Sequence, residues 1–308
     1  MSRPPPSPEE PLAFDAAALP RVADAPRLSR AKCPLLRQIE IVDEHGDRHW
    51  IDIPAERPLT VFVDRRELVT LMTLGASPEL LVLGYLLNQG LIASVGEVDG
   101  IDVDWDVESA AVKTREGIAD IASKTARRIV TTGCGQGTVF GDAMAQLDEL
   151  SLPAAQAARI DQKTLAQVLE QMRQRQSVHR QAGSVHGCAL FQGSQMLVFV
   201  EDVGRHNAID TIAGWMAMHG ITGGDKIFYT TGRLTSEMVM KAARMGVPIV
   251  ASRNGVTAMG HELATKLGMT LFGRAANRRF LCYSGFERFD PDPDFERWRE
   301  PAQATAAV

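Results

Sequence analysis

One cysteine of the sequence lies in a glycine-rich segment that would leave its thiol open to reaction. Cys134 stands within the run TTGCGQGT at 131–138. A cysteine reacts as its thiolate, and cations such as the nearby Arg127 and Arg128 favour that form. The segment therefore predicts either a nucleophilic thiol that carries a group or a small side chain in a tight turn, since cysteine is often buried.

The other three cysteines have apolar neighbours and are expected to pack in the core. Cys33, Cys188 and Cys282 lie far apart, without a CxxC pair or the Cys/His spacing of a structural zinc site. His186 and Cys188 are two residues apart, but two ligands without a third are weak evidence for a metal. The sequence predicts neither disulfides nor a metal centre.

Arginines follow several predicted strands in the second half of the chain. Ligands of open α/β sheets collect where strands end, because helix N-termini there direct backbone N–H groups outward. Glycine lets a phosphate approach the backbone, and arginine binds it through paired hydrogen bonds. We therefore expect a pocket for a phosphorylated, nucleotide-like ligand, although each arginine taken singly also fits a solvated loop. The candidate residues are Gly204, Arg205, His206, Asn207, Arg233, Arg253, Arg274, Ala275, Ala276, Asn277, Arg278 and Arg279.

Three carboxylates accompany these arginines. Glu201, Asp202 and Glu237 could orient the arginines, accept hydrogen bonds from a base or ribose, or cap helices. The sequence contains neither a GxGxxG segment nor a Walker A loop, so no motif supports a dinucleotide oxidoreductase or a P-loop NTPase.

The second half alternates between strand-like and helix-like segments. Strands are predicted at 196–200, 226–231, 247–252, 269–272 and 280–283, and helices near 206–219, 235–245 and 257–267. An amphipathic helix is also expected around Leu165, Val168 and Leu169. The three helices between strands each end at a glycine, which adopts the left-handed cap cheaply. This alternation predicts an α/β layered sheet.

The first half indicates a smaller α/β subdomain. Short strands are predicted at 38–42, 50–53 and 59–63, a hairpin at 101–106 and 110–113, and a strand at 129–132. A helix should begin at Pro78, with Ser77 as its N-cap. The expected organisation is a flexible proline-rich arm over 1–30, the subdomain with the cysteine loop over 31–155, an α/β domain with the crevice over 156–290 and a polar tail over 291–308.

Composition limits the classes of function. The chain has 308 residues, 45% of them hydrophobic and 23% charged, and a net charge of −5. This balance argues against wholesale nucleic-acid binding, so an anionic ligand would need a local basic cluster. The N-terminal residues have no signal-peptide pattern and no apolar run is long enough to span a bilayer, which makes the cytoplasm the expected compartment.

Three segments together resemble the FdhD family of formate dehydrogenase accessory sulfur carriers. EDVGRHNAID at 201–210 is similar to the family stretch EDVGRHNA(L/I)D, and GRLTSEM at 232–238 to its GRxSxEM, with Thr235 for the usual serine. LGYLLNQGLI at 83–92 is similar to LGFLLxEGII, with Gln89 for the usual acid. The resemblance extends from about residue 59 to residue 285.

The resemblance implies a core like that of cytidine deaminases, usually dimeric and without deaminase activity. In agreement, the sequence lacks the HxE and PCxxC segments that bind zinc in deaminases. The resemblance also implies that a loop cysteine, here Cys134, accepts persulfide sulfur from a cysteine desulfurase. It would pass the sulfur to the bis-molybdopterin guanine dinucleotide cofactor of a formate dehydrogenase catalytic subunit, with GDP or GMP as partial ligands. The family's basic cofactor-binding segment falls on 274–279, here RAANRR rather than the usual FxRxGR type.

The cysteine loop departs from the family pattern at one position. The family loop CGxCG would place a second cysteine at Gly137. A single thiol suffices to hold a persulfide, so sulfur carriage at Cys134 remains open, whereas a mechanism that needs both cysteines is excluded. Two other interpretations remain: a chaperone that binds and delivers the cofactor without sulfur transfer, and a nucleotide-binding module without a role in molybdenum or tungsten chemistry.

Overall fold

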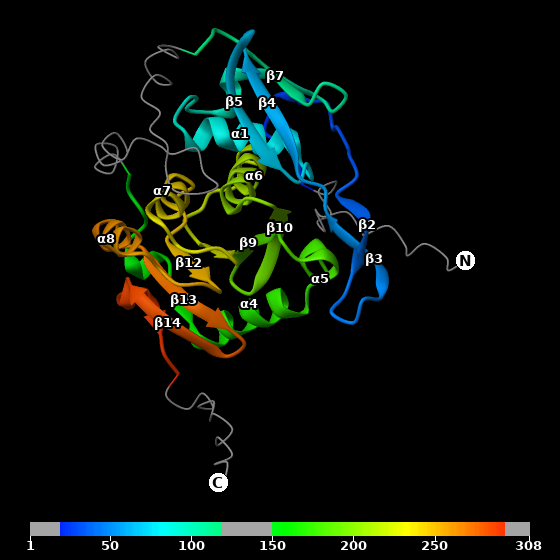
Figure 1. Ribbon diagram of the computed structural model, residues 1–308. Coiled ribbons are helices and arrows are strands. Elements are labelled where there is room, and N and C mark those ends of the chain that lie inside the picture. Colours follow the sequence, from blue (N-terminus) through cyan, green and yellow to red (C-terminus); the bar gives the residue numbers. More distant parts are fainter. Residues whose placement is uncertain (1–18, 119–149, 293–308) are drawn as a thin grey trace.

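The computed structural model describes residues 19–118 and 150–292, which form two large β-sheets with helices between and around them, and two small two-stranded sheets (Figure 1). This mixed architecture confirms the α/β class. The cytidine-deaminase-like layering and the domain boundaries stay predictions. Within the described ranges, no helix is long and apolar enough to cross a membrane.

The first sheet has five strands in the order β1-β6-β7-β4-β5. Buried residues alternate with partly buried ones along β4 and with exposed ones along β7, because successive side chains point to opposite faces and only one face meets the core. Helix α1 covers that face. The elements are β1 (Arg27–Leu28), β4 (Arg57–Val63), β5 (Arg66–Thr73), α1 (Pro78–Asn88), β6 (Val98–Asp104) and β7 (Ser109–Thr114).

The second sheet has six strands in the order β10-β9-β11-β12-β13-β14. The three strands β11, β12 and β13 are parallel, so their carboxyl ends meet at one edge of the sheet. The strands are β9 (His186–Gln192), β10 (Gln195–Asp202), β11 (Lys226–Thr230), β12 (Ile249–Ser252), β13 (Thr270–Ala276) and β14 (Arg279–Ser284).

Helices cover both faces of the second sheet (Figure 1). One face packs against α6 (Arg205–Met218), α7 (Ser236–Arg244) and α8 (Ala258–Lys266) in a core that includes Trp215 and Phe228. The other face packs against α4 (Gln162–Gln174) around Phe191 and Phe272. Strands buried on both faces explain the continuous apolar character of β11 and β12.

The two sheets are joined through α1 and α6, which cross at a pair of glycines. An ideal Cβ at Gly84 would lie 1.7 Å from the carbonyl oxygen of Asp210, and one at Gly214 would lie 2.1 Å from that of Leu80. Any side chain at either position would therefore force the helices apart.

Helix ends agree with the expectations from sequence. Gly220, Gly246 and Gly268, which follow α6, α7 and α8, have φ values of 63°, 72° and 61°. This confirms the three glycine stops. Helix α1 begins at Pro78 as predicted, although the Ser77 side chain makes no capping hydrogen bond.

Several assignments differ from the sequence expectation. Residues 19–30, assigned to the flexible arm, instead pack on the first sheet: Arg27 and Leu28 pair with β6, and Arg27 forms an ion pair with Asp102. The strand at 129–132, and the flexible character expected for 1–18 and for most of the tail, concern residues outside the described ranges. Sequence inspection did not identify β5, β9 or the short helix α5 (Val178–Ala182).

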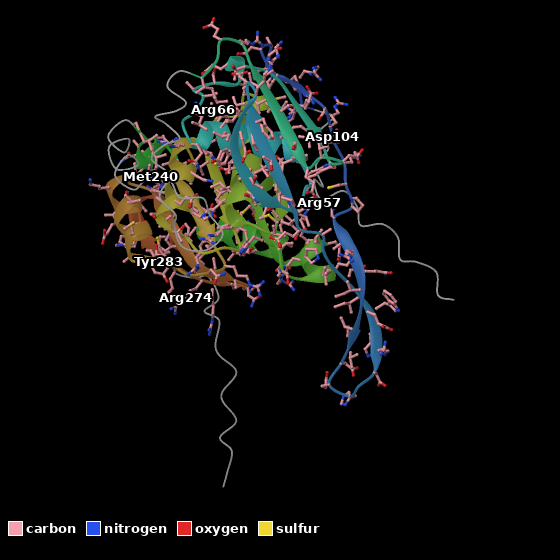
Figure 2. The ribbon with its side chains drawn as sticks, turned by 45° about the horizontal axis from the view of Figure 1, so that its top comes forward. Arg57, Arg66, Asp104, Met240, Arg274 and Tyr283 are labelled. Carbon is pink, nitrogen blue, oxygen red and sulfur yellow. The ribbon has the colours of Figure 1, made fainter. Side chains whose placement is uncertain are left out.

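The predicted strands at 38–42 and 50–53 form a separate hairpin. Strands β2 (Leu36–Val42) and β3 (Arg48–Pro54) pair only with each other and extend away from the rest of the molecule, as Figure 2 shows. The remaining short elements are β8 (Ile160–Asp161), β15 (Phe289–Asp290) and three 3₁₀ turns at Val95–Glu97, Ala155–Ala157 and Phe286–Arg288.

Candidate functional site at the carboxyl edge of the second sheet

A pocket of about 300 Å³, here called the cationic crevice, opens where β11, β12 and β13 end. Thr231 and Arg253 directly follow β11 and β12, and Ala275, Ala276 and Asn277 come from the end of β13 and the turn after it. The carboxyl edge of a parallel sheet is where α/β proteins bind ligands, so the crevice is a candidate site, and its ligand stays a prediction.

The crevice carries an excess of positive charge. Its walls contain four arginines, one carboxylate from Glu201 and the imidazole of His179, which gives a formal charge of +3 when the histidine is neutral. The four arginines are Arg173, Arg175, Arg180 and Arg253. Guanidinium groups bind phosphate through paired charge-assisted hydrogen bonds, so this pocket suits an anionic ligand in a chain of negative net charge.

Two of these arginines are held by neighbouring residues. Arg173 forms an exposed ion pair with Glu170 one turn earlier on α4. The guanidinium carbon of Arg175 lies 4.8 Å from the ring centroid of Phe199, a cation–π arrangement. A third, Arg180, donates a hydrogen bond to the backbone carbonyl of Arg173 (3.2 Å), so Arg253 is the arginine of the crevice best placed to meet a ligand.

Glu201 positions one wall of the crevice. Its carboxylate accepts hydrogen bonds from the backbone N–H groups of Val178 (2.7 Å) and His179 (3.0 Å), at the start of α5. Burial raises the pKa of Glu201, and these hydrogen bonds limit the rise. Of the roles considered for this residue, the structure supports helix capping, because both carboxylate oxygens already accept backbone donors.

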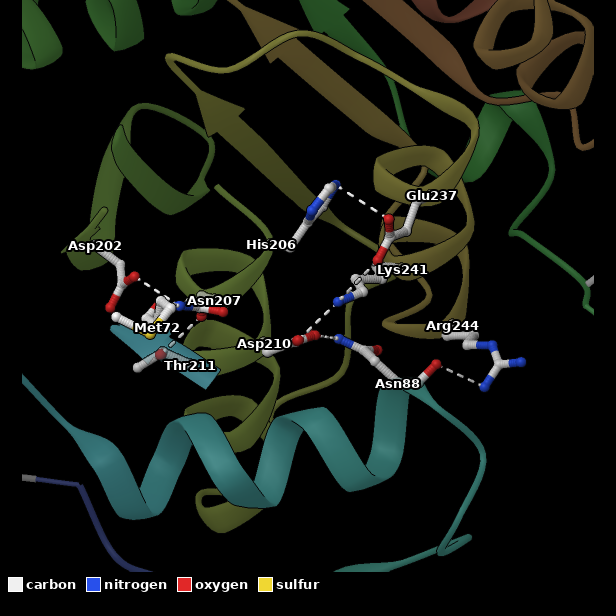
Figure 3. Close-up of polar contacts among 10 residues, drawn as sticks. All are labelled: Met72, Asn88, Asp202, His206, Asn207, Asp210, Thr211, Glu237, Lys241 and Arg244. Carbon is white, nitrogen blue, oxygen red and sulfur yellow. Dashed lines mark hydrogen bonds and ion pairs between the residues drawn. The ribbon is translucent and has the colours of Figure 1, made fainter. Parts of the chain in front are cut away.

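Asp202 links the two sheets. Its carboxylate accepts hydrogen bonds from the Thr73 hydroxyl (2.5 Å) and the backbone of Leu74 (3.1 Å) on one side. On the other it accepts from the backbone of Gly204 (2.9 Å) and the amide of Asn207 (2.7 Å), which also donates to the carbonyl of Met72 (Figure 3). Through Asp202 and Asn207, the β10–α6 turn is therefore hydrogen-bonded to the end of β5 and to Leu74.

The expected cofactor-binding residues are not all gathered in one place. Ala275, Ala276, Asn277 and Arg253 line the crevice, whereas Gly204, His206 and Asn207 line a second pocket among α1, α6 and α7. Arg205 lies against Gly232, where an added Cβ would come within 2.6 Å of the arginine Cδ. The side chains of Arg233, Arg274, Arg278 and Arg279 are exposed outside the crevice, and Figure 2 shows Arg274 at the periphery.

Comparison with known proteins decides the family. The FdhD/NarQ family profile matches residues 54–290. This chain belongs to the FdhD/NarQ family. It is 28% identical over 236 residues to the sulfur carrier protein FdhD of Listeria innocua, covering 77% of this chain and 90% of that one. It is 30% identical over 233 residues to FdhD of Bacillus licheniformis, covering 76% and 88%.

A solved structure agrees with the family assignment. The fold matches a crystal structure described as that of a formate dehydrogenase accessory protein from Desulfotalea psychrophila, with a TM-score of 0.65 and 25% sequence identity. The match covers 82% of this chain and 98% of the other. The FdhD resemblance based on three short segments is thus confirmed over most of the chain.

The described cysteines of this chain are poor nucleophiles. Burial raises the pKa of Cys188 to about 12 and that of Cys282 to about 11, and also raises the pKa of Cys33. All three thiols are free. Cys134 lies outside the described residues, so its role as the sulfur-carrying thiol stays a prediction.

Sequence inspection missed one wall of the crevice. Arg173, Arg175 and Arg180 come from the end of α4 and from α5, and Ser177 and His179 lie beside them. Three arginines within eight residues were the available signal, but on an amphipathic helix such residues are usually a solvated face. Only the packing of α4 under the sheet brings them to the carboxyl edge.

Asp202 should give this protein a measurable pH dependence of stability. Burial raises the pKa of this carboxyl from 3.8 to about 6, against the effect of its four hydrogen-bond donors. The folded chain therefore binds this proton more tightly than the unfolded chain does. Its contribution to stability is full below about pH 4 and is lost as the pH rises through about 6.

Asp202→Asn removes this titration. We expect the stability advantage of wild type over the variant to shrink by about 3 kcal/mol between pH 4 and pH 7, measured by urea unfolding. Asp102→Asn is a control in which the pH dependence has the opposite sign. The hydrogen bond from Arg27 lowers the pKa of Asp102, so the stability advantage of wild type over this variant should grow as the pH rises. A difference between wild type and Asp202→Asn that does not change with pH would contradict the prediction.

Proposed function

We propose that this protein carries sulfur for the maturation of a formate dehydrogenase, and that the cationic crevice binds the guanine dinucleotide part of the molybdenum or tungsten cofactor. Membership of the FdhD/NarQ family supports the first part. The observation that carries the second is the gathering of Arg173, Arg175, Arg180 and Arg253 beside the ends of β11, β12 and β13.

The proposed sulfur donor is a cysteine desulfurase, and the proposed acceptor on this chain is Cys134. The Cys134 thiolate would attack the outer sulfur of the desulfurase persulfide, forming a new sulfur–sulfur bond and releasing the desulfurase cysteine as its thiolate. No electron is gained or lost overall, and one thiol on this chain is enough. The cofactor is the cargo, the formate dehydrogenase catalytic subunit its destination, and a homodimer the proposed assembly.

Intact-mass spectrometry tests the sulfur step. After incubation with a cysteine desulfurase and cysteine, wild-type protein should gain the mass of one sulfur, and reductant should remove it. Cys134→Ala should show no gain, whereas Cys188→Ala should retain it, because the thiolate form of buried Cys188 is strongly disfavoured. Absence of a gain on wild-type protein that still binds GDP would favour the alternative, a cofactor chaperone suggested by Gly137 in place of a second cysteine.

The crevice is tested by titration with GDP. Arg253→Gln should weaken GDP binding by about tenfold, because a charge-assisted hydrogen bond to phosphate is lost. Arg233→Gln is the matched control: the same change at an exposed arginine outside the crevice should alter affinity by less than about twofold. Equal losses in the two variants would show that GDP does not bind in the crevice.

A further inference from the structure

The hairpin of β2 and β3 projects from the molecule without a larger sheet to support it (Figure 2). It is held at its base, where Leu36 packs against the cluster that contains Val178 and the Gln181 side chain donates to the Asp52 carboxylate at 2.8 Å. A two-stranded hairpin by itself is marginally stable in water. The outer part of this hairpin, which precedes the residues 54–290 matched by the family profile, therefore suits contact with another chain.

The middle of β3 exposes a large aromatic side chain on an open strand edge. Trp50 is 67% exposed and its neighbour Ile51 is 43% exposed. Within the described ranges, β3 pairs with β2 alone, so its other edge can receive a further strand. Strand edges that stay free usually carry lysine, proline or a bulge, whereas tryptophan is enriched at protein interfaces. The edge of β3 therefore has the character of an interface.

The hydrogen bonds of the hairpin fix which backbone groups of β3 point outward. The N–H of Ala55 donates to the carbonyl of Leu35 opposite it at 2.8 Å, and the ladder continues toward the turn without a bulge. Every second residue of an antiparallel strand bonds to the partner strand, so the odd-numbered residues of β3 face β2. The N–H and C=O groups of Arg48, Trp50 and Asp52 therefore point away from β2, and in the described part of the chain no backbone group pairs with them.

The side chains along this edge are complementary to themselves. Two copies of β3 that pair antiparallel about Trp50 place Arg48 of each copy opposite Asp52 of the other. All three residues point their backbone groups outward, so each facing pair can exchange two backbone hydrogen bonds. Opposite charges that face each other across strands stabilise a sheet, and like charges destabilise it. A two-fold axis at Arg48 or at Asp52 would oppose like charges, which favours the register centred on Trp50.

Both charged side chains are accessible to a second copy. Arg48 is 71% exposed, and its Nη1 donates to Glu40 of the same hairpin at 2.8 Å. A guanidinium group has five N–H donors, so this contact leaves others for a second carboxylate. Gln181 donates to Oδ2 of Asp52, and within the described ranges Oδ1 receives no donor. The contacts inside one chain therefore hold these groups in place without saturating them.

We propose that β3 pairs edge to edge with β3 of a second copy of this chain, so that the two hairpins form one four-stranded sheet. Two Arg48–Asp52 ion pairs flank a central pair of Trp50 side chains, and both copies use the same surface, as two-fold symmetry requires. The inference rests on the homodimer proposed above and gives it an interface. Neither Cys134 nor Arg253 takes part, so its failure would leave the sulfur and GDP tests unchanged.

Analytical ultracentrifugation of the full-length protein tests the charge pairing. Arg48→Asp should weaken dimerisation by at least about tenfold, because the new carboxylate faces Asp52 of the other copy. The double variant Arg48→Asp/Asp52→Arg exchanges the two charges and should restore most of the lost affinity. Lys113→Asp is the matched control, since it removes an exposed cation that pairs with Asp99 on the first sheet and should leave dimerisation unchanged.

Cross-linking tests the register. Facing residues that exchange hydrogen bonds have Cα atoms about 5.5 Å apart, within the range of a disulfide. Under mild oxidation, Trp50→Cys should therefore form more covalent dimer than wild type does, and reductant should remove it. Val42→Cys is the matched control, because Val42 is 61% exposed but lies on β2, away from the proposed axis.

Three results would each overturn the proposal. The first is wild-type protein that stays monomeric at about 100 µM, which would assign the exposed strand to a different partner. The second is a dimer that Arg48→Asp leaves as stable as wild type. The third is a Trp50→Cys protein that cross-links no more than Val42→Cys, which would place the contact between copies on another surface.

Discussion

Gly84→Ala is expected to destabilise the folded chain by about 3 kcal/mol or more, a large share of the stability of an ordinary domain. The added Cβ would lie 1.7 Å from the carbonyl oxygen of Asp210 and 2.6 Å from the backbone nitrogen of Gly214. These atoms belong to the backbone of α6, so no side-chain rotation can relieve the overlap. The helices must separate, and the contacts between the two sheets weaken with them.

Urea unfolding of wild type and variant measures this effect. Gly224→Ala is the matched control, because an ideal Cβ there meets only the ring of Pro153, at 3.8 Å, and Gly224 does not have a positive φ. The control should change stability by less than about 0.5 kcal/mol. A Gly84→Ala protein as stable as Gly224→Ala would show that α1 and α6 do not cross at this glycine pair.

Lys241→Met is the second substitution with a large expected effect. It removes the cation that faces Asp210 and Glu237 and leaves a fully buried carboxylate without its charged partner. Burial disfavours the charged form of Lys241, but Asp210 and Glu237 outweigh this effect and raise its pKa. Breaking a buried pair from one side costs about 3–5 kcal/mol, so the unfolding free energy should fall by that amount.

Two comparisons make this prediction specific. The double variant Asp210→Asn/Lys241→Met should recover part of the loss, because no uncompensated charge remains at the pair. Lys113→Met removes the exposed ion pair with Asp99 and should cost less than about 1 kcal/mol. Equal losses of unfolding free energy in Lys241→Met and Lys113→Met would contradict a buried charge network. So would a loss in the double variant equal to the sum of the losses in Asp210→Asn and Lys241→Met.

The motif 201–210 illustrates how a correct family resemblance can leave residue roles open. Its letters identified the FdhD family correctly, but they left open whether Glu201 and Asp202 orient arginines, bind a ligand or cap helices. In the structure, Glu201 caps α5, Asp202 joins two sheets and Asp210 pairs with Lys241. A carboxylate in a sequence carries no information about which donors the fold brings to it, because donors such as Val178, Thr73 and Lys241 lie on other elements, 23, 129 and 31 positions away.

Sequence alone determined the elements whose signals are local. The strand and helix alternation of the second half, the glycine stops after α6, α7 and α8, and the start of α1 at Pro78 all follow from periodicity and backbone preference within a few residues. A pocket at the ends of the parallel strands could also be expected, because its place depends on sheet topology rather than on single side chains.

Tertiary structure decided which charges share a pocket. Arg180 reaches the crevice only because Glu201 holds the start of α5, whereas Arg233, which follows β11, and Arg274, which lies within β13, remain outside. Glu237 and His206, 31 positions apart, meet because α6 and α7 pack side by side on one face of the sheet. Packing of helices and sheets brings such residues together through contacts distant in sequence, and no local pattern records them.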